Sequence, residues 1–431
     1  MATKAIIYLL ILFIGYVFCF VDPFWGIATY IFMNFVRPEV VSYNALLPYN
    51  LPLVTAIIII ISSMIKYKPG SLSRVIFSPI IISLLLMVFC MWLSGLNAID
   101  PKTSNRYTLE IFKFIIISIL IVMLTDTEKK LHYFLIVNLI GGGFLTIWAF
   151  EQHFRGNERL ELVGGGTTAT SNGIATLFVL IFPILVHLIG SKNIFIRIFA
   201  LVASLATVAD IVFTQSRSAF FALFIQVIAL LWQYKSKYKY YFIVSLIPIF
   251  IYAASTTFIG ETSYFDRINS AVNDGMDVDT SASNRKLLWK IALITFSENP
   301  FVGVGQQNFK YVVIDKDLYD GKEGPTDAHN TLLLLLCEGG LFTITFYLIA
   351  LDLFFIKLQR IKFLIKNKDN YYYYNLALAF QVGMVGFLIS SLAHSFVVFE
   401  YYYYFISFPL IMECVLISRI KKEPFAKRTA S

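Results

Sequence analysis

Long apolar runs recur along most of this 431-residue chain, and they restrict the possible folds more than any other feature. The runs have about 17 to 25 residues, the length at which a helix crosses the hydrocarbon layer of a membrane. Lipid offers the backbone no hydrogen-bond partners, and the alternation typical of a membrane β-barrel does not occur. Hydrophobic residues make up 58% of the chain and charged residues 14%, whereas soluble domains have about half and a quarter. We therefore expect an all-α fold, a polytopic bundle of membrane helices.

The second apolar run is short and is compatible with a segment that dips into the membrane without crossing it, so we expect twelve or thirteen spans. The first run ends without a small-residue cleavage site and is interpreted as a retained span, not a signal peptide. The expected spans are residues 4–20, 24–36, 51–65, 76–96, 107–125, 131–149, 173–190, 194–213, 218–234, 239–258, 329–356, 373–395 and 399–419.

Lysine and arginine gather in short segments between spans, and such segments usually face the cytoplasm. The segments are residues 66–74, 129–130, 235–239, 357–368 and 419–428. If the second segment does not cross, the amino terminus is cytoplasmic as well. The same assignment places residues 37–50, 150–172 and 259–328 outside.

We expect four regions along the chain: a transmembrane bundle (1–258), a periplasmic loop domain (259–328), further transmembrane helices (329–420) and a cytoplasmic tail (421–431). The large loop contains a predicted helix near 284–297, with a serine cap at its start and a proline after its end. Its apolar face comprises Leu287, Leu288, Ile291 and Ala292. We expect this helix to lie over the outer mouth of the bundle and to cover a site.

His329 begins the span that follows this loop. The positive end of the helix dipole disfavours an imidazolium there, so we expect a neutral ring that is able to accept a proton. Such a ring suits a general base that acts on a hydroxyl group. Asp327 or Asn330 can orient it. The alternative is a capping or interfacial histidine.

Arg217 lies between two spans, where an arginine beside lipid needs a partner or has a role in a pathway. One interpretation pairs it with Asp210, seven residues earlier. The other is a guanidinium fork that binds phosphate oxygens. Arg285 begins the external helix and Arg267 precedes it. Together the three arginines suggest an anionic ligand outside the membrane.

Other polar groups give weaker signals. The sequence DVD at 277–279 is compatible with a divalent-ion site, although a solvated acidic loop explains it better. We predict no metal, because the remaining histidines do not cluster at ligand spacing, and no cofactor. The four cysteines lie in apolar runs, the net charge of +8 collects in short loops and implies no nucleic acid, and the role of Glu338 is open.

Three segments resemble, in order, the motif blocks of the O-antigen ligase and polymerase family. They are FTQSRSAFF, with its Ser216–Arg217 pair, then SNRKLLWKIALITFSENPFVGVGQQNF, then DAHNTLLLLLCEGGLFTITFYL. The resemblance covers about residues 200–350, and GNERLELVGGGTTATSNGIA extends it upstream. The opening FVDPFWGIATYIFMNFVRPEVV is similar to the branch described as O-glycosylation ligases associated with exosortase systems. In EGGLFTI this chain lacks a further glycine that many relatives carry.

The resemblance implies a GT-C-like, metal-independent glycosyltransferase of the bacterial inner membrane with its active site facing the periplasm. The donor would be a glycan on undecaprenyl pyrophosphate, transferred with inversion. Arg217 and Arg285 would hold the pyrophosphate, Arg267 would be a third cation and Arg159 a helper, and His329 would activate the acceptor hydroxyl.

Several activities remain open at this level. The acceptor can be the lipid A core, a growing glycan or a protein, which corresponds to a ligase, a polymerase or a protein O-oligosaccharyltransferase. A flippase or transporter for a polysaccharide lipid is the alternative from another class, and it would be favoured by discontinuous helices and paired repeats.

Overall fold

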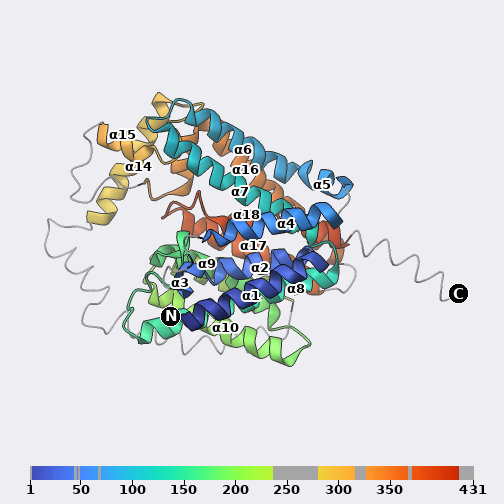
Figure 1. Cartoon of the computed structure of the whole chain (residues 1–431). Helices are drawn as coiled ribbons and strands as arrows, with labels where there is room; N and C mark the ends of the chain where they lie inside the picture. Colours follow the sequence, from blue (N-terminus) through green and yellow to red (C-terminus); the bar gives the residue numbers. More distant parts are fainter. Residues whose placement is uncertain are drawn as a thin grey trace.

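The computed structural model describes residues 2–42, 46, 49–66, 69–235, 280–315, 327–366 and 371–416. Most of the helices that it describes run across the molecule from one end to the other, inclined to one another, and α14 lies obliquely at the left end (Figure 1). They are α1 (Ala2–Val21), α2 (Phe24–Phe35), α3 (Pro38–Val41), α4 (Leu51–Lys66), α5 (Pro69–Ile76), α6 (Pro79–Gly95), α7 (Pro101–Leu124), α8 (Glu128–Phe154), the 3-10 turn η2 (Gly166–Thr168), α9 (Ser171–Leu188), α10 (Ile194–Phe213), α11 (Arg217–Gln233), α14 (Thr280–Glu298), α15 (Phe309–Asp315), α16 (Thr331–Lys366), α17 (Tyr371–Ser391) and α18 (Glu400–Ile406).

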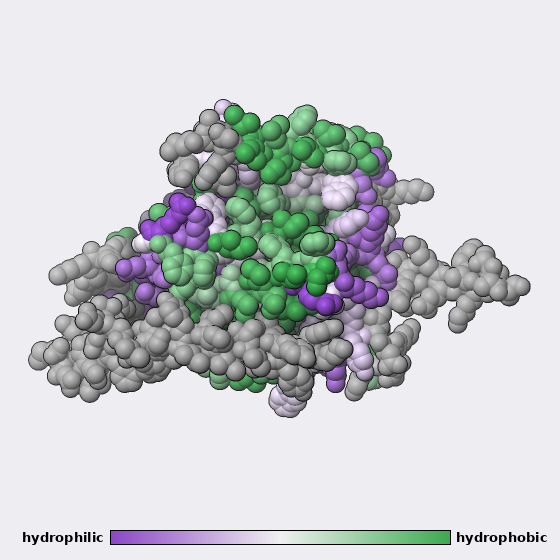
Figure 2. Space-filling model, turned by 90° about the horizontal axis from the view of Figure 1, so that it is seen from below, coloured by the Kyte–Doolittle hydropathy of each residue, from purple (hydrophilic) through white to green (hydrophobic). Residues whose placement is uncertain are grey.

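The predicted all-α membrane fold is confirmed. Within the described residues, six helices are long and apolar enough to cross a membrane, and four shorter apolar helices accompany them. Every expected span coincides with a described helix, except that residues 239–258 and the end of the last span lie outside the described residues. Figure 2 shows a hydrophobic middle band with hydrophilic residues gathered toward both ends of the bundle. This is the surface that a lipid layer would cover.

Short polar residues determine where several helices begin. Asp100 accepts hydrogen bonds from the backbone of Lys102 and Thr103 at the start of α7, and Thr127 caps α8 in the same way. Thr170 caps α9 and Asn193 caps α10. These side chains satisfy backbone N–H groups that have no partner inside the helix.

The first two helices form a hairpin. Lys66 at the end of α4 donates to the carbonyl of Val21, and Lys130 lies 3.1 Å from Asp22, so α1 ends beside these basic residues. The hydroxyl of Tyr8 donates to the carbonyl of Val36 at 2.7 Å, so α2 returns along α1 to the other end. Helix α1 therefore starts at the end opposite Lys66 and Lys130, and the 12 residues of α2 return along most of α1 toward that end.

Helix α16 was expected to be continuous, but it breaks at Gly340, which has φ 71° and ψ −176°. The break lies nine residues after Thr331, about 13 Å along the helix. A loop from residues 299–308 supplies the missing backbone partners. Leu341 donates to the carbonyl of Pro300 at 2.8 Å, and the carbonyl of Cys337 accepts from Val304 at 3.1 Å. These bonds make a broken helix tolerable inside the bundle, because no backbone group there meets lipid unpaired.

Glu338, whose role the sequence left open, forms hydrogen bonds to this loop and to the first residue of α15. Its side chain is buried, and its carboxylate accepts a hydrogen bond from the backbone of Phe309 at 3.1 Å. Its backbone carbonyl accepts from Gly305 at 2.9 Å and from the hydroxyl of Ser94. Glu338 therefore positions the loop that leads into α15 and ties it to the end of α6.

Candidate active site

Helix α14 lies at one end of the bundle and positions Arg285. Leu288, Ile291 and Ala292 are buried against the bundle, as the predicted apolar face requires. The indole of Trp289 donates to the carbonyl of Ala328 at 3.0 Å. Arg285 precedes Trp289 by one helical turn and shares its face, so it is directed to the segment that carries His329. We call this end of the molecule, with α14, residues 327–331 and residues 392–399, the α14 end; in Figure 1 it lies on the left.

The segment before α16 presents His329 on a strained turn. His329 has a positive φ of 46°, which is uncommon for a residue other than glycine. One oxygen of Asp327 accepts the backbone N–H of His329 at 2.9 Å and lies 3.2 Å from its Nδ1. Because Nδ1 faces this carboxylate, Nε2 is the ring nitrogen that can accept a proton. Asp327 thus contacts both the backbone and the ring of His329 and fixes how the ring is oriented.

Asn330 and Thr331 join this turn to a distant part of the chain. The side chain of Asn330 accepts from the backbone of Leu332 and Leu333, both at 3.0 Å, and so caps α16. Its amide donates to the carbonyl of Leu392 at 3.0 Å. The hydroxyl of Thr331 donates to the carbonyl of His394 at 2.9 Å and accepts from the backbone of Phe396 at 2.8 Å. Residues 392–396 are therefore fixed against the start of α16.

This connection brings His394 into the candidate site. The expected span 373–395 is too long, because α17 ends at Ser391 and His394 lies in the segment after it. Burial, and after it the charges of Arg285, His329 and Arg159, lower the pKa of His394 to about 3. These three groups come from α14, from the turn before α16 and from the segment after α8, so charges from remote parts of the chain act on one imidazole.

Arg217 begins α11 and is exposed. Helices α11 and α17 run antiparallel, since Lys235 after α11 donates to Asn375 early in α17 at 2.9 Å, and Gln226 donates to Val382 at 3.1 Å. When the same pairing continues along the two helices, Arg217 lies beside the carboxyl-terminal end of α17. The chain leads from that end to His394. Arg217 thus lies at the α14 end, but no described contact joins it to His329 or Arg285.

The proposed structural partner of Arg217 is not used. Asp210 is fully buried in α10, and neither of its side-chain oxygens has a hydrogen-bond partner within the described residues. Among those residues no ion pair joins Asp210 to Arg217. Ser216, which precedes Arg217, is buried and forms no side-chain cap on α11; its hydroxyl lies 3.5 Å from that of Ser218.

Backbone strain marks the same segments. Leu160 and Leu162, which flank Glu161, the partner of Arg159, have φ of 51° and 60°. Gln215, which precedes Ser216, has φ of 54°. Together with His329, these residues adopt a conformation that L-amino acids disfavour. Such strain gathers at functional sites, where the surrounding structure maintains it.

The other cations have separate positions. Arg159 is exposed and lies 3.7 Å from Glu161. Arg37, which the sequence argument did not single out, pairs with Glu400 and lies beside Gly166. Arg267 and the sequence DVD at 277–279 lie outside the described residues. In the described parts of the chain, no group of three or more His, Cys, Asp or Glu side chains could hold a metal ion.

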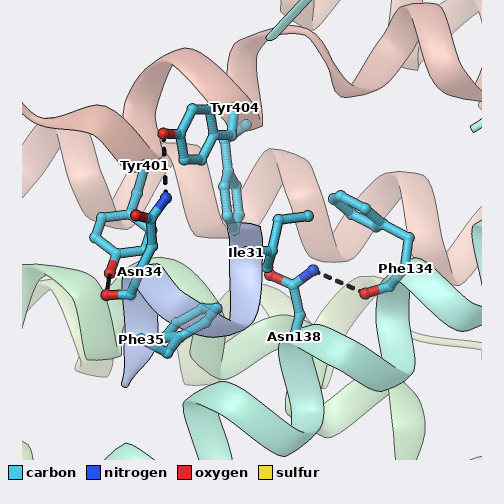
Figure 3. A pocket seen from close by; sticks show the side chains of 8 residues that line it. Ile31, Asn34, Phe35, Phe134, Asn138, Tyr401 and Tyr404 are labelled. Atoms are coloured by element: carbon cyan, nitrogen blue, oxygen red, sulfur yellow. Dashed lines mark hydrogen bonds between the residues drawn. The ribbon is translucent and has the colours of Figure 1, made fainter. Parts of the chain in front are cut away.

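A small cavity between α2, α8 and α18 is not part of this site (Figure 3). It measures about 10 Å³, barely enough for one water molecule. Its polar groups are already paired: Asn34 donates to the hydroxyl of Tyr404 at 3.2 Å, and Tyr401 donates to the carbonyl of Asn34 at 2.6 Å. This cavity is a packing feature that joins α2 to α18.

His394 is the residue that sequence reasoning missed. It was grouped with histidines that lack ligand spacing, and the assumed span placed it inside the membrane. The signal was the polar sequence SSLAHS at 390–395, which interrupts two apolar runs. Read as the end of a span, this sequence would have placed an imidazole at the same boundary as His329.

Comparison with known families agrees with the order of the motifs. Residues 201–348 match the family model described as O-antigen ligase. Residues 3–193 match a family of unknown function. No curated protein is significantly similar to the chain. The first match includes Arg217, α14 and His329, whereas Arg159 lies in the second and His394 follows both.

Proposed function

We propose, from the premise that residues 201–348 form a domain of the O-antigen ligase family, that this membrane protein transfers a glycan from a lipid pyrophosphate to an acceptor hydroxyl. The donor is a glycan linked to undecaprenyl pyrophosphate. The membrane is the bacterial inner membrane, and the α14 end faces the periplasm. There the lipid tail of the donor stays in the bilayer while the acceptor arrives from water.

One observation supports this proposal: α14, which carries Arg285, and the segment of His394 both contact the turn of His329 and Asp327 at one end of the helix bundle. Guanidinium groups bind phosphate oxygens in pairs and keep their charge in any surroundings. A histidine oriented by a carboxylate is the usual arrangement for a general base. Cations for a phosphate and a base for a hydroxyl are the two components that glycosyl transfer from a pyrophosphate needs.

The reaction is a single displacement at the anomeric carbon. His329 takes the proton of the acceptor hydroxyl through Nε2, and Asp327 stabilises the resulting imidazolium. The acceptor oxygen forms a bond to the anomeric carbon while the bond from that carbon to the pyrophosphate oxygen breaks, which inverts the configuration. Undecaprenyl pyrophosphate leaves with the bonding electrons, and preorganised arginines stabilise the negative charge.

Arg217, Arg285 and Arg267 hold the pyrophosphate in this proposal, and Arg159 assists them. Arg217 begins α11 at the same end of the bundle. Asn330 acts by positioning, since it caps α16 and holds the segment of His394. These guanidinium groups neutralise the leaving group, so the proposed reaction uses no metal ion and no cofactor.

Purified protein in proteoliposomes tests the proposal directly. Lipid-linked oligosaccharide is supplied with lipid A core, with a second lipid-linked glycan or with an acceptor protein, and released undecaprenyl pyrophosphate is measured with each. We expect release with one acceptor class, which assigns the protein as ligase, polymerase or protein transferase. No release with any acceptor, together with movement of the donor across the bilayer, would support the flippase alternative instead.

The break in α16 is the observation that favours a transporter. Discontinuous helices bind substrates in many transporters, typically as a pair from two repeats. Here, the break in α16 lies at Gly340, and backbone groups of residues 299–308 occupy it. A break filled by the protein itself offers no open binding site, so transfer remains the better proposal.

Replacing Arg285 or Arg217 with lysine tests the phosphate clamp. Lysine keeps the charge but loses the planar fork. We expect kcat/KM for transfer to fall about tenfold to a hundredfold in each variant, because a hydrogen bond to a charged group contributes roughly 1.5 to 3 kcal/mol.

The matched control is Arg155→Lys, because Arg155 is exposed and pairs with Glu151 on its own helix. It should leave transfer unchanged. Full activity of both Arg217→Lys and Arg285→Lys would show that a point charge is sufficient and would contradict bidentate binding of pyrophosphate.

A further inference from the structure

The position of His394 is closely linked to the turn that carries His329. Its backbone is fixed by Thr331 and its neighbour Leu392 by Asn330, two hydrogen-bonded links to the turn that carries His329. Its ring is partly buried and lies 5.9 Å from that of Phe396. The backbone of His394 is thus held against the strained turn of His329, which fixes where its side chain enters the site.

We propose that His394 is a further phosphate-binding residue of this site, and that it takes up a proton when the pyrophosphate of the donor binds. This inference rests on the proposed function, because it concerns the same site and the same donor. The ligand chemistry is a pyrophosphate group, either inorganic or carried by a lipid.

The surrounding charges explain why the ring is neutral before the donor binds. Helix α14 with Arg285 and the segment of His394 both contact the turn of His329, while Asp327 lies against His329 and Glu161 against Arg159. Burial, and after it the charges of Arg285, His329 and Arg159, hold the pKa of His394 at about 3, so the imidazole carries no charge at neutral pH. The site therefore avoids one more positive charge while it is empty.

Binding of pyrophosphate adds negative charge beside His394 and therefore raises the pKa of its imidazole. A negative charge about 4 Å from a partly buried imidazole raises its pKa by about three, and pyrophosphate carries at least two such charges. The pKa then passes from about 3 to near or above neutrality, so one proton moves from solvent to the ring. The protonated ring donates a charge-assisted hydrogen bond to a phosphate oxygen, and it returns the proton when lipid pyrophosphate leaves.

The sign of the pH dependence follows. Below the pKa of the bound state, protonation of His394 supports binding; as pH rises through that pKa, this contribution is lost. We therefore expect affinity for pyrophosphate to decrease from pH 6 to pH 8, with uptake of about one proton on binding near pH 6.5.

Calorimetric titration of purified full-length protein in detergent measures this uptake, using two buffers of different ionisation enthalpy at pH 6.5. The probes are inorganic pyrophosphate and undecaprenyl pyrophosphate, with undecaprenol as the control without phosphate. His394→Gln should bind pyrophosphate about tenfold or more weakly and take up no proton. His329→Gln should still take up the proton, and His132→Gln, changed near the start of α8, should behave as the wild type.

The outcomes separate this inference from the proposed function. Wild-type binding without proton uptake, or equal uptake by His394→Gln, would overturn the role of His394 while leaving glycan transfer intact. Uptake that disappears with His394→Gln in a protein that transfers no glycan would support the phosphate site and reject the transfer reaction. A preference for lipid over inorganic pyrophosphate would identify the lipid-linked source.

Discussion

Replacing His329 with alanine is expected to slow glycan transfer about 100- to 10,000-fold, the usual contribution of a general base. The donor should still bind with nearly unchanged affinity, because the arginines that hold the pyrophosphate remain. The effect should therefore appear in kcat and not in the dissociation constant of undecaprenyl pyrophosphate.

Asp327→Asn provides the matched test of the same arrangement. The carboxylate of Asp327 faces Nδ1 of His329 and also fixes the backbone of the turn. The amide preserves the shape and the backbone contact but loses the charge that stabilises the imidazolium. We expect a loss smaller than that of His329→Ala, with correct folding. His132→Ala is the control, since His132 lies on α8 and outside the proposed machinery.

The measurement is the initial rate of undecaprenyl pyrophosphate release in proteoliposomes, with donor binding measured separately. An unchanged rate for His329→Ala would remove this residue as the base. Loss of rate together with loss of donor binding would instead indicate that the turn before α16 collapsed, which the melting temperature of each variant distinguishes.

Replacing Gly340 with alanine should strongly destabilise the fold. A Cβ atom there would lie 2.3 Å from the backbone oxygen of Phe301, and the φ of 71° is itself disfavoured for alanine. Backbone strain and overpacking together cost roughly 2 to 6 kcal/mol. The colliding atom belongs to a backbone that is hydrogen-bonded to α16, so it cannot move away without breaking those bonds.

Gly156→Ala separates the two contributions. Gly156 also has a positive φ, of 98°, but no atom lies within 4 Å of the Cβ position. Thermal unfolding in detergent should show a small decrease for Gly156→Ala and a much larger decrease, or failure to fold, for Gly340→Ala. Equal melting temperatures for Gly340→Ala and wild type would show that α16 can close its break.

Most of the fold could be predicted from local chemistry. Apolar length specifies a membrane helix because lipid leaves the backbone no other partner, and residues such as Asp100 and Thr127 show where helices begin. The helix of the large loop was predicted from its caps and apolar face, and α14 lies where that face requires. The candidate residues are His329, Arg217 and Arg285. The order of the motifs indicates them, and for the arginines so does the high free energy of a charged side chain beside lipid, which usually marks a functional residue.

Three features depended on contacts between distant segments. The break in α16 requires the backbone of residues 299–308, and no local pattern distinguishes EGG in a closed helix from EGG at a break. The return of α2 along α1 depends on Tyr8, Lys66 and Lys130. The place of His394 depends on hydrogen bonds from Asn330 and Thr331, more than sixty residues earlier.

The sequence by itself thus determined the class of fold, its long apolar helices, the helix of the large loop and three groups suited to phosphate and proton chemistry, whereas α3, α5 and α15 were not predicted. Burial and helix formation follow from nearest neighbours along the chain and from the solvent, so they can be read residue by residue. Only the tertiary structure decided which of these groups meet. Hydrogen bonds and electrostatic interactions act through a few ångströms of space, so the neighbours of His394 depend on how α14, the turn before α16 and the segment after α17 come together.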